Sequence, residues 1–113
     1  MNKDILIYGA SGYTAELIID RAVAGGERPI LGGRSAAKIG PLAERLGLPV
    51  RIFALDDPQV IAAQLAGVGV VLNCAGPFSR TAKSLAAACI ASGTHYLDIT
   101  GEIEVFEAMA ARD

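Results

Sequence analysis

The sequence contains no tryptophan, one histidine and two cysteines among its 113 residues, and aromatic residues make up 5% of it. Cys74 and Cys89 match no paired metal-binding spacing and are too few for a disulfide framework, which predicts a reducing, cytoplasmic environment. Basic residues are not in excess: ten Lys and Arg stand against twelve Asp and Glu, for a net charge of −2. This balance argues against a nucleic-acid-binding surface, which needs clustered positive charge.

Long apolar runs are also missing. No run reaches the roughly 18 residues that a membrane-spanning helix needs. The start of the chain does not resemble a signal peptide either, because Asp4 interrupts it and the apolar stretch Ile5–Tyr8 is short. We therefore expect no membrane partner.

The sequence does contain enough apolar residues for one core. Hydrophobic residues make up 52% of it and charged residues 19%, and its length matches one domain. The last residue, Asp113, follows the helical run Glu104–Arg112 with no stop signal. We interpret residues 1–113 as one domain from the N-terminal part of a longer protein, with a complete small protein as the alternative.

Short apolar runs with strand character alternate with stretches of helical periodicity, and no internal repeat is visible. Strands are expected at Ile5–Tyr8, Pro29–Leu31, Val50–Ala54, Val68–Cys74 and His95–Ile99. Helices are expected at Ala15–Ala24, Ala36–Leu46, Pro58–Ala66 and Thr81–Ser92, with a partial one at Glu104–Arg112. This alternation predicts an α/β, Rossmann-type doubly wound parallel sheet, with strand order 3-2-1-4-5 and helices on both faces.

Caps and apolar faces refine this prediction. Ser35 and Asp57 are expected to cap the second and third helices. Leu17, Ile18 and Ala22 are expected to face the core from the first helix. The run Leu85–Ile90 is interpreted as core in the fourth helix.

A glycine turn joins the first strand to the first helix and reads Gly9-Ala-Ser-Gly12-Tyr-Thr-Ala15. Gly9 permits a tight exit from the strand, Gly12 lacks the Cβ that would block a phosphate, and Ala15 allows close helix packing. The N–H groups at the helix start then favour an anion. Further donors are expected from Ser11, Tyr13 and Thr14. The turn predicts a dinucleotide site, whereas a turn without ligand is the alternative.

The second turn discriminates between dinucleotides. An NAD site places Asp or Glu there to bind the ribose 2′-hydroxyl, whereas this sequence reads Gly32-Gly-Arg34-Ser35. Arg34 offers a planar set of donors to a 2′-phosphate, Ser35 adds a hydroxyl, and Lys38 adds a second charge. We therefore favour NADP(H), with NAD(H) as the alternative cofactor and a solvated loop arginine as the alternative interpretation of Arg34.

Two further segments follow later strands. Asp56 is placed to accept a hydrogen bond from the adenine amino group, or else begins the turn before Pro58. Ala75 and Gly76 give backbone access to the ribose, and Pro77 is expected to form part of a wall near the nicotinamide. Both segments lie at the crevice where ligands bind to such sheets.

Taken together, these residues resemble the N-terminal domain of saccharopine dehydrogenase-like oxidoreductases, which include trans-acting enoyl reductases. The resemblance is carried by Gly9–Ala15, Gly33–Ser35 with Lys38, Asn73–Phe78 and above all Gly93–Glu102. It implies hydride transfer between a nicotinamide, generally of NADP(H), and a small-molecule substrate held mainly by a C-terminal domain. A homo-oligomer would form through that second domain. No catalytic residue and no metal site is identified.

Other interpretations remain open. A short-chain reductase would need a Tyr-x-x-x-Lys pair, and no tyrosine here is followed by lysine at that spacing. An acyl-phosphate reductase would need an activated cysteine, but neither cysteine has a visible His partner. A non-catalytic NADP-sensing module is the alternative from another class. His95 is interpreted as structural or exposed. Asp98 and Glu102 either hold the second domain or position substrate, with helix capping by Thr100 or charge pairing as the alternative.

Overall fold

The computed structural model describes residues 4–10, 12–74 and 78–98 of the chain. Within these ranges the strands are β1 (Asp4–Tyr8), β2 (Ile30–Gly33), β3 (Val50–Ile52), β4 (Val68–Asn73) and β5 (His95–Asp98). The helices are α1 (Tyr13–Ala24), α2 (Ala36–Leu46), α3 (Pro58–Gln64) and α4 (Phe78–Ser92). The strands form one parallel sheet in the order β3-β2-β1-β4-β5, which confirms the predicted topology.

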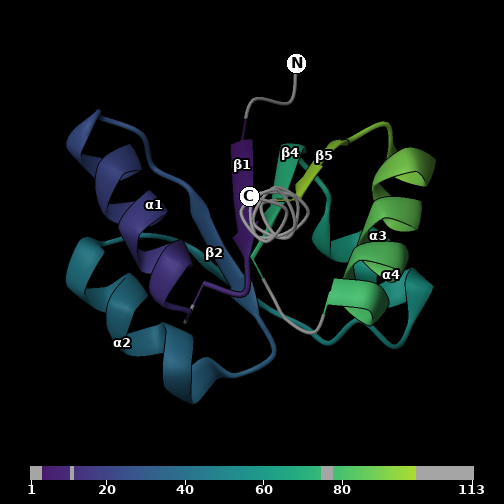
Figure 1. The fold of residues 1–113 in the computed structure, drawn as a ribbon, viewed down its shortest axis with the longest axis horizontal. Helices are drawn as coiled ribbons and strands as arrows, with labels where there is room; N and C mark the ends of the chain where they lie inside the picture. The colour runs from purple at the N-terminus through teal and green to yellow at the C-terminus, as the bar shows by residue number, and fades with distance from the viewer. Residues whose placement is uncertain (1–3, 11, 75–77, 99–113) are drawn as a thin grey trace, which may run out of the picture.

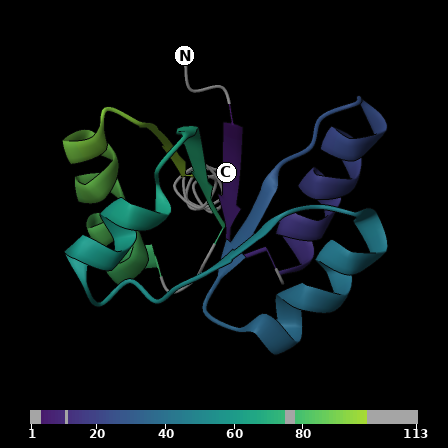
Figure 2. The ribbon, with the colours of Figure 1, turned by 180° about the vertical axis from the view of Figure 1, so that it is seen from behind.

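The helices form a layer on each side of this sheet. Helices α1 and α2 lie on one side and α3 and α4 on the other (Figures 1 and 2). Two buried clusters correspond to these layers, one built around Leu6, Tyr8 and Phe53 and the other around Ile7, Ile19 and Ile39. Because alternate residues of β1 point to opposite faces, this single strand contributes to both clusters.

Strand β1 occupies the centre of the sheet. Tyr8, its last residue, pairs with Gly32 of β2 on one side and with Asn73 of β4 on the other. The chain therefore leaves β1 beside the point where the strand order reverses, which is where open α/β sheets bind ligands.

The predicted helix caps are confirmed. The Ser35 side chain accepts a hydrogen bond from the Lys38 N–H at 3.3 Å, and the Asp57 carboxylate accepts one from the Gln59 N–H at 2.9 Å. The opposite end of α3 is bound by Arg51, whose guanidinium donates to the backbone carbonyl groups of Gln64 and Ala66. Local signals in the sequence therefore fix where α2 and α3 begin.

Several predicted boundaries were wrong by one to three residues. Helix α1 begins at Tyr13 rather than Ala15, because its first turn is exposed and lacks the apolar pattern. Strand β2 runs on through Gly32 and Gly33, whose backbones pair with β3 although they have no side chains to signal a strand. The other shifted boundaries are Asp4 for β1, Ile30 at the start of β2, Ile52 for β3, Gln64 for α3, Asn73 for β4 and Phe78 for α4. The predicted Ile99 and Glu104–Arg112 lie outside the described residues.

Two predicted core positions were also wrong. Leu17 is 51% exposed, because the buried stripe of α1 runs through Ala15 and Ile19, one helical turn apart. Ile90 is 81% exposed, whereas Leu85 and Cys89 on the same helix are fully buried. Each misplaced residue lies about 100° or more around its helix from the buried stripe.

Candidate nucleotide-binding site

The predicted site residues follow successive strands at the carboxyl edge of the sheet. Gly9 follows β1, Arg34 follows β2, and Asp56 lies four residues beyond the end of β3. Since the strands are parallel, these three positions lie along one edge. Ser11, Ala75, Gly76 and Pro77 lie outside the described residues, so their predicted roles stay predictions.

The first glycine of the turn is required by the fold. Gly9 has a φ of +81°, a conformation that L side chains rarely adopt. Its N–H and that of Ala10 both donate to the carbonyl oxygen of Gly32, at 2.9 and 3.1 Å. The turn is thereby bound to the end of β2 before it reaches α1.

The second glycine is not required in this way. Gly12 has a φ of −79° and a ψ of 157°, which any residue adopts, and an added Cβ would lie 3.7 Å from the Gly9 oxygen, an ordinary contact. Gly12, Tyr13 and Thr14 are all exposed. Neither backbone strain nor internal packing accounts for glycine at position 12, so its missing side chain serves the space outside the turn.

That space lies at the N-terminus of α1. Gly12 caps this helix without a side-chain hydrogen bond, and the first intrahelical bond runs from the Glu16 N–H to the Gly12 oxygen at 2.9 Å. The preceding N–H groups, those of Tyr13, Thr14 and Ala15, have no carbonyl four residues earlier within the helix. Together with the helix dipole, they favour an anion at this exposed end, which faces the carboxyl edge (Figure 1).

The second turn places positive charge at the start of α2. Arg34 and Lys38 are exposed, and Ser35 between them is partly exposed. The Ser35 hydroxyl oxygen accepts the helix-capping bond, which leaves its O–H free to donate elsewhere. No carboxylate occurs in the segment 32–35. The arrangement favours a phosphate over the two hydroxyls of an unmodified ribose.

The glycines before Arg34 allow close packing. A Cβ on Gly33 would lie 2.3 Å from Cδ1 of Ile39 and 3.9 Å from the Gly9 nitrogen. A Cβ on Gly32 would lie 3.0 Å from Cδ1 of Leu6. These glycines let α2 and the first turn approach β2, a structural role that sequence reasoning missed by treating them as loop residues.

Tyr8 is the residue of this edge whose role the sequence did not reveal. Its buried hydroxyl donates to the Phe53 carbonyl oxygen at 2.7 Å, and the two rings lie 5.0 Å apart. Burial raises the pKa of this phenol above its usual value, while Arg34 lowers that pKa and Asp56 raises it. Both charged groups therefore lie within electrostatic range of the Tyr8 hydroxyl.

Asp56 and Asp57 follow β3 and differ in what the structure shows of their roles. The cap of α3 is supplied by Asp57. The neighbouring Asp56 side chain is exposed and has no part in that cap. Hydrogen bonding of Asp56 to an adenine amino group stays a prediction.

The other side of the switch point carries buried polar groups. Asn73 is fully buried, and its Nδ2 donates to the Tyr96 hydroxyl at 3.0 Å. The Cys74 N–H donates to the Tyr8 carbonyl oxygen at 2.8 Å and so holds the exit of β4 against β1. The predicted nicotinamide side of the crevice begins here.

The buried cysteine does not suit nucleophilic chemistry. Cys89 is fully buried, and burial raises the pKa of its thiol to about 11. A thiol with that pKa is almost entirely protonated near neutral pH and reacts poorly. Cys74 is partly buried against the cluster beside α1 and α2. Within the described ranges, no group of His, Cys, Asp and Glu is arranged to hold a metal ion.

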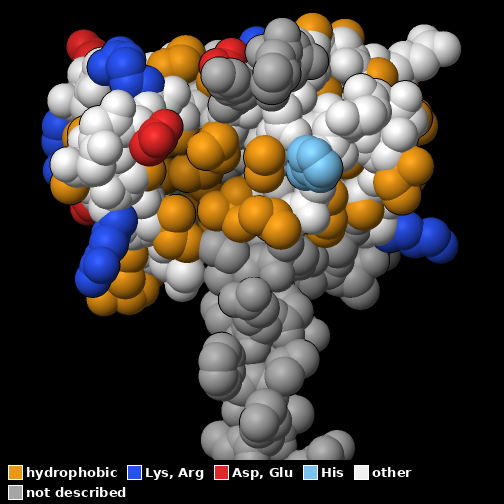
Figure 3. All heavy atoms as spheres, turned by 90° about the horizontal axis from the view of Figure 1, so that it is seen from above, with side chains coloured by type: hydrophobic (Ala, Val, Ile, Leu, Met, Phe, Trp, Pro, Cys, Tyr) orange, Lys and Arg blue, Asp and Glu red, His pale blue; other side chains and the backbone are white. Residues whose placement is uncertain are grey.

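His95 lies apart from the carboxyl edge. It is the first residue of β5, pairs with Val70, and is exposed beside a gathering of hydrophobic side chains (Figure 3). Asp98, at the other end of β5, pairs with Asn73 at the carboxyl edge. Glu102 lies outside the described residues, so its role stays open.

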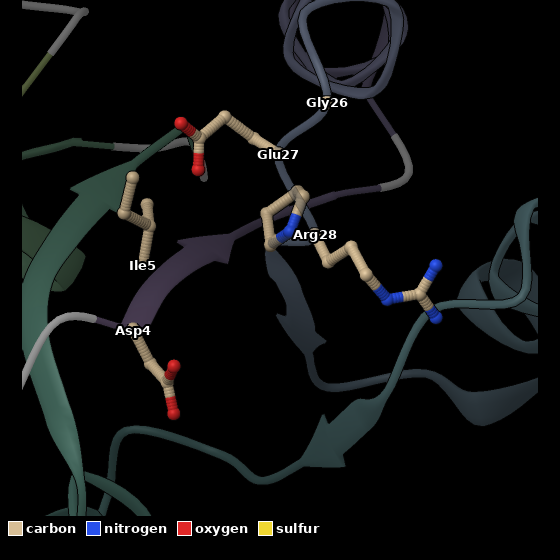
Figure 4. Close-up of a pocket in the computed structure, with 6 residues that line it drawn as sticks. Asp4, Ile5, Gly26, Glu27 and Arg28 are labelled. Carbon is tan, nitrogen blue, oxygen red and sulfur yellow. The ribbon is translucent and has the colours of Figure 1, made fainter.

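A separate hollow of about 310 Å³ lies at the amino ends of the strands, opposite the carboxyl edge. It is lined by Asp4, Ile5, Gly26, Glu27, Arg28 and Pro29 (Figure 4). The Arg28 side chain points away from the acidic residues and donates to the Gly47 carbonyl oxygen. Because this hollow surrounds the start of β1, it is not where a doubly wound sheet binds a nucleotide.

None of the helices in the described ranges is long and apolar enough to span a bilayer.

Comparison with known proteins identifies a family and curated relatives of this chain. The family model described as saccharopine dehydrogenase NADP binding domain matches residues 5–112. A putative trans-acting enoyl reductase of Mycobacterium tuberculosis is 38% identical over 106 residues, covering 88% of this chain and 25% of the relative. A trans-acting enoyl reductase of Mycobacterium leprae is 32% identical over 107 residues, covering 88% and 26%. The chain spans about a quarter of the length of these curated relatives.

Solved structures share the fold. Apo saccharopine dehydrogenase (L-Glu forming) from Saccharomyces cerevisiae superposes with a TM-score of 0.75 at 23% identity, covering 85% of this chain and 21% of that one. AtPrR2, solved with NADP⁺ and (+)pinoresinol, gives a TM-score of 0.68 at 22% identity, covering 85% and 36%. At this level of identity the two structures establish the Rossmann-type architecture and nothing more specific.

Proposed function

The chain belongs to the saccharopine dehydrogenase NADP binding domain family, and from this membership we propose that it binds NADP(H) across the carboxyl edge of its sheet. The observation that carries the proposal is the exposed N-terminus of α1, which glycine caps without any side-chain hydrogen bond. One strand away, Arg34 is exposed where an NAD site would have a carboxylate. The two features suit a diphosphate and a 2′-phosphate respectively.

Each part of the cofactor has its own group of residues in this proposal. The diphosphate lies against the first turn, which comprises Gly9, Ser11, Gly12, Tyr13 and Thr14. The 2′-phosphate is bound by Arg34, Ser35 and Lys38, and the adenine amino group by Asp56. The ribose lies along Ala75 and Gly76, and Pro77 forms part of a wall near the nicotinamide.

We further propose that residues 1–113 form a single dinucleotide-binding domain within an NADP(H)-dependent oxidoreductase of the cytoplasm. The names of the enoyl reductase relatives and their fourfold greater length support this. The bound nicotinamide supplies or accepts the hydride, while the residues of this chain bind and orient it. The small-molecule substrate is then held mainly by parts of the protein beyond this domain, which can also support a homo-oligomer.

Calorimetric titration with NADPH and NADH tests cofactor binding. We expect NADPH to bind at least about tenfold more tightly, because a charge-assisted bond to the 2′-phosphate contributes about 1.5–3 kcal/mol. Adenosine 2′,5′-bisphosphate should compete with NADPH. Equal affinity for both dinucleotides would overturn the preference for NADP(H), and no binding of either would overturn the site.

A second experiment tests the oxidoreductase. The full-length protein that contains this domain is assayed for NADPH oxidation with enoyl and imino substrates. Turnover with one of them supports the proposal. Binding of NADPH without turnover of any of them would favour the sensing module instead.

A further inference from the structure

The last residue of β1 is placed to organise the adenosine half of the proposed cofactor site. Tyr8 is 2% exposed, pairs with Gly32 and Asn73, and directly precedes Gly9. Its side chain joins the cluster that α3 and α4 cover. On this face of the sheet its hydroxyl donates a hydrogen bond to the carbonyl oxygen of Phe53, which lies 45 positions later in the chain.

The contact that Tyr8 makes lies just beyond the end of β3. Strand β3 has three residues and ends at Ile52, after which the Phe53 N–H still donates to the Gly33 oxygen at 2.9 Å. The Phe53 carbonyl oxygen accepts the Tyr8 hydroxyl at 2.7 Å, with the two rings tilted by 55°. Both backbone polar groups of Phe53 are thus paired, one with β2 and one with Tyr8. Two residues, Ala54 and Leu55, then separate Phe53 from Asp56.

Two charged groups of the proposed adenosine subsite act on the Tyr8 phenol that makes this contact. Arg34 follows β2, Asp56 follows β3, and the Tyr8 phenol lies within electrostatic range of both. Without this hydrogen bond, the segment that carries Asp56 would no longer be fixed to the last residue of β1. A buried carbonyl that loses its donor is costly, so the segment would rearrange rather than stay in place.

We propose that Tyr8 is a positioning residue for the adenosine half of the cofactor, because its phenol fixes the segment from Phe53 to Asp56 against the end of β1. This inference rests on the proposed function. It predicts that loss of one hydroxyl, with no cofactor contact removed, weakens the adenosine subsite.

The test compares Tyr8→Phe with Tyr96→Phe, which removes the same atom from a phenol that bonds Asn73 on the other side of the switch point. The probe is adenosine 2′,5′-bisphosphate, titrated by calorimetry. Tyr8→Phe should weaken its binding by about fivefold, as expected for loss of one neutral hydrogen bond. Tyr96→Phe should leave it unchanged. A purely structural role would lower the melting temperature of either variant without this selective loss.

Three results would overturn the inference. A folded Tyr8→Phe variant that binds the bisphosphate as tightly as the unmodified chain contradicts it and leaves the proposed function intact. If that variant does not fold, the unmodified chain is titrated with the bisphosphate and followed by NMR. The signals of the amides of residues 54–56 and of the Tyr8 ring should then shift, and unshifted signals contradict the inference. If the unmodified chain binds neither NADPH nor the bisphosphate, the proposed function and this inference both fail.

Discussion

Three of the helices that follow a strand at the carboxyl edge have a described N-cap, and one of these three begins differently. Helices α2 and α3 start behind Ser35 and Asp57, whose side chains accept hydrogen bonds from first-turn N–H groups. Helix α1 starts behind Gly12, which has no side chain to accept one. In α2 and α3 the cap satisfies one of the N-terminal N–H groups, whereas in α1 the cap residue leaves these groups available to the proposed diphosphate.

The two glycines of the first turn show that this difference is not a by-product of the backbone. Gly9 is required by its positive φ and by the contact with β2. Gly12 has an ordinary conformation and room for a Cβ. The fold would therefore accept a capping side chain at position 12, and the proposed diphosphate gives a reason for its absence.

Gly12→Asp should give the largest effect, because it turns α1 into a helix of the capped kind. A carboxylate close to the diphosphate should weaken NADPH binding on the order of a hundredfold, given the repulsion of about 1–4 kcal/mol for unit charges 4 Å apart. The same cap should raise the free energy of unfolding by a few tenths of a kcal/mol. Calorimetric titration and urea unfolding measure the two opposite changes.

Gly12→Asn is the matched control, since it caps the helix without adding charge. Its loss of affinity should be clearly smaller than that of Gly12→Asp. If Gly12→Asp bound NADPH like the unmodified chain, the open N-terminus would have no role in binding.

Arg34→Ala tests the second turn and comes next in size. Binding of NADPH should weaken by about 1.5–3 kcal/mol, while binding of NADH should hardly change. Because Arg34 is exposed, the free energy of unfolding should stay within about 0.5 kcal/mol. Arg34→Lys should give an intermediate loss, and equal losses for both dinucleotides would remove Arg34 from the 2′-phosphate site.

Gly9→Ala separates the two glycines of the turn. A side chain at φ +81° should lower the free energy of unfolding by about 1–2 kcal/mol, measured by urea unfolding. Gly12→Ala should cost less, since its backbone conformation is unstrained. Equal destabilisation by both substitutions would contradict the conclusion that the fold requires glycine at position 9 but not at position 12.

Ser35→Ala and Asp57→Ala should give the smallest effects. Each should lower the free energy of unfolding by about 1 kcal/mol, because each removes a helix cap. Ser35→Ala should in addition weaken NADPH binding a few-fold through the lost hydroxyl donor, whereas Asp57→Ala should not. An equal loss of affinity in both variants would mean that Ser35 acts on the cofactor only through the fold.

Much of the fold was predictable because its signals are local. The glycine turn, the caps Ser35 and Asp57 and the alternation of elements each lie within a few residues of the feature that they specify. These signals were enough to predict the strand order correctly. Boundaries were less accurate where the backbone continued without an apolar pattern, as at Gly32 and Gly33.

The features that the sequence did not reveal depend on distant contacts. The Tyr8 hydroxyl bonds a carbonyl 45 residues away, and nothing near Tyr8 in the sequence marks that pairing. The exposure of Leu17 and Ile90 likewise depends on which side of each helix lies against the sheet. Candidate site residues on local turns could thus be proposed from the sequence. Tyr8, which bonds the segment that follows β3, could not.

NMR titration of the chain with NADPH shows whether the first-turn amides of α1 bind the diphosphate. The backbone N–H signals of Tyr13, Thr14 and Ala15 should shift together and saturate at the same concentration as calorimetric binding. The first-turn amides of α3, which Asp57 caps, should move far less. Saturable binding that leaves the α1 amides unshifted would contradict docking of the diphosphate at the N-terminus of α1.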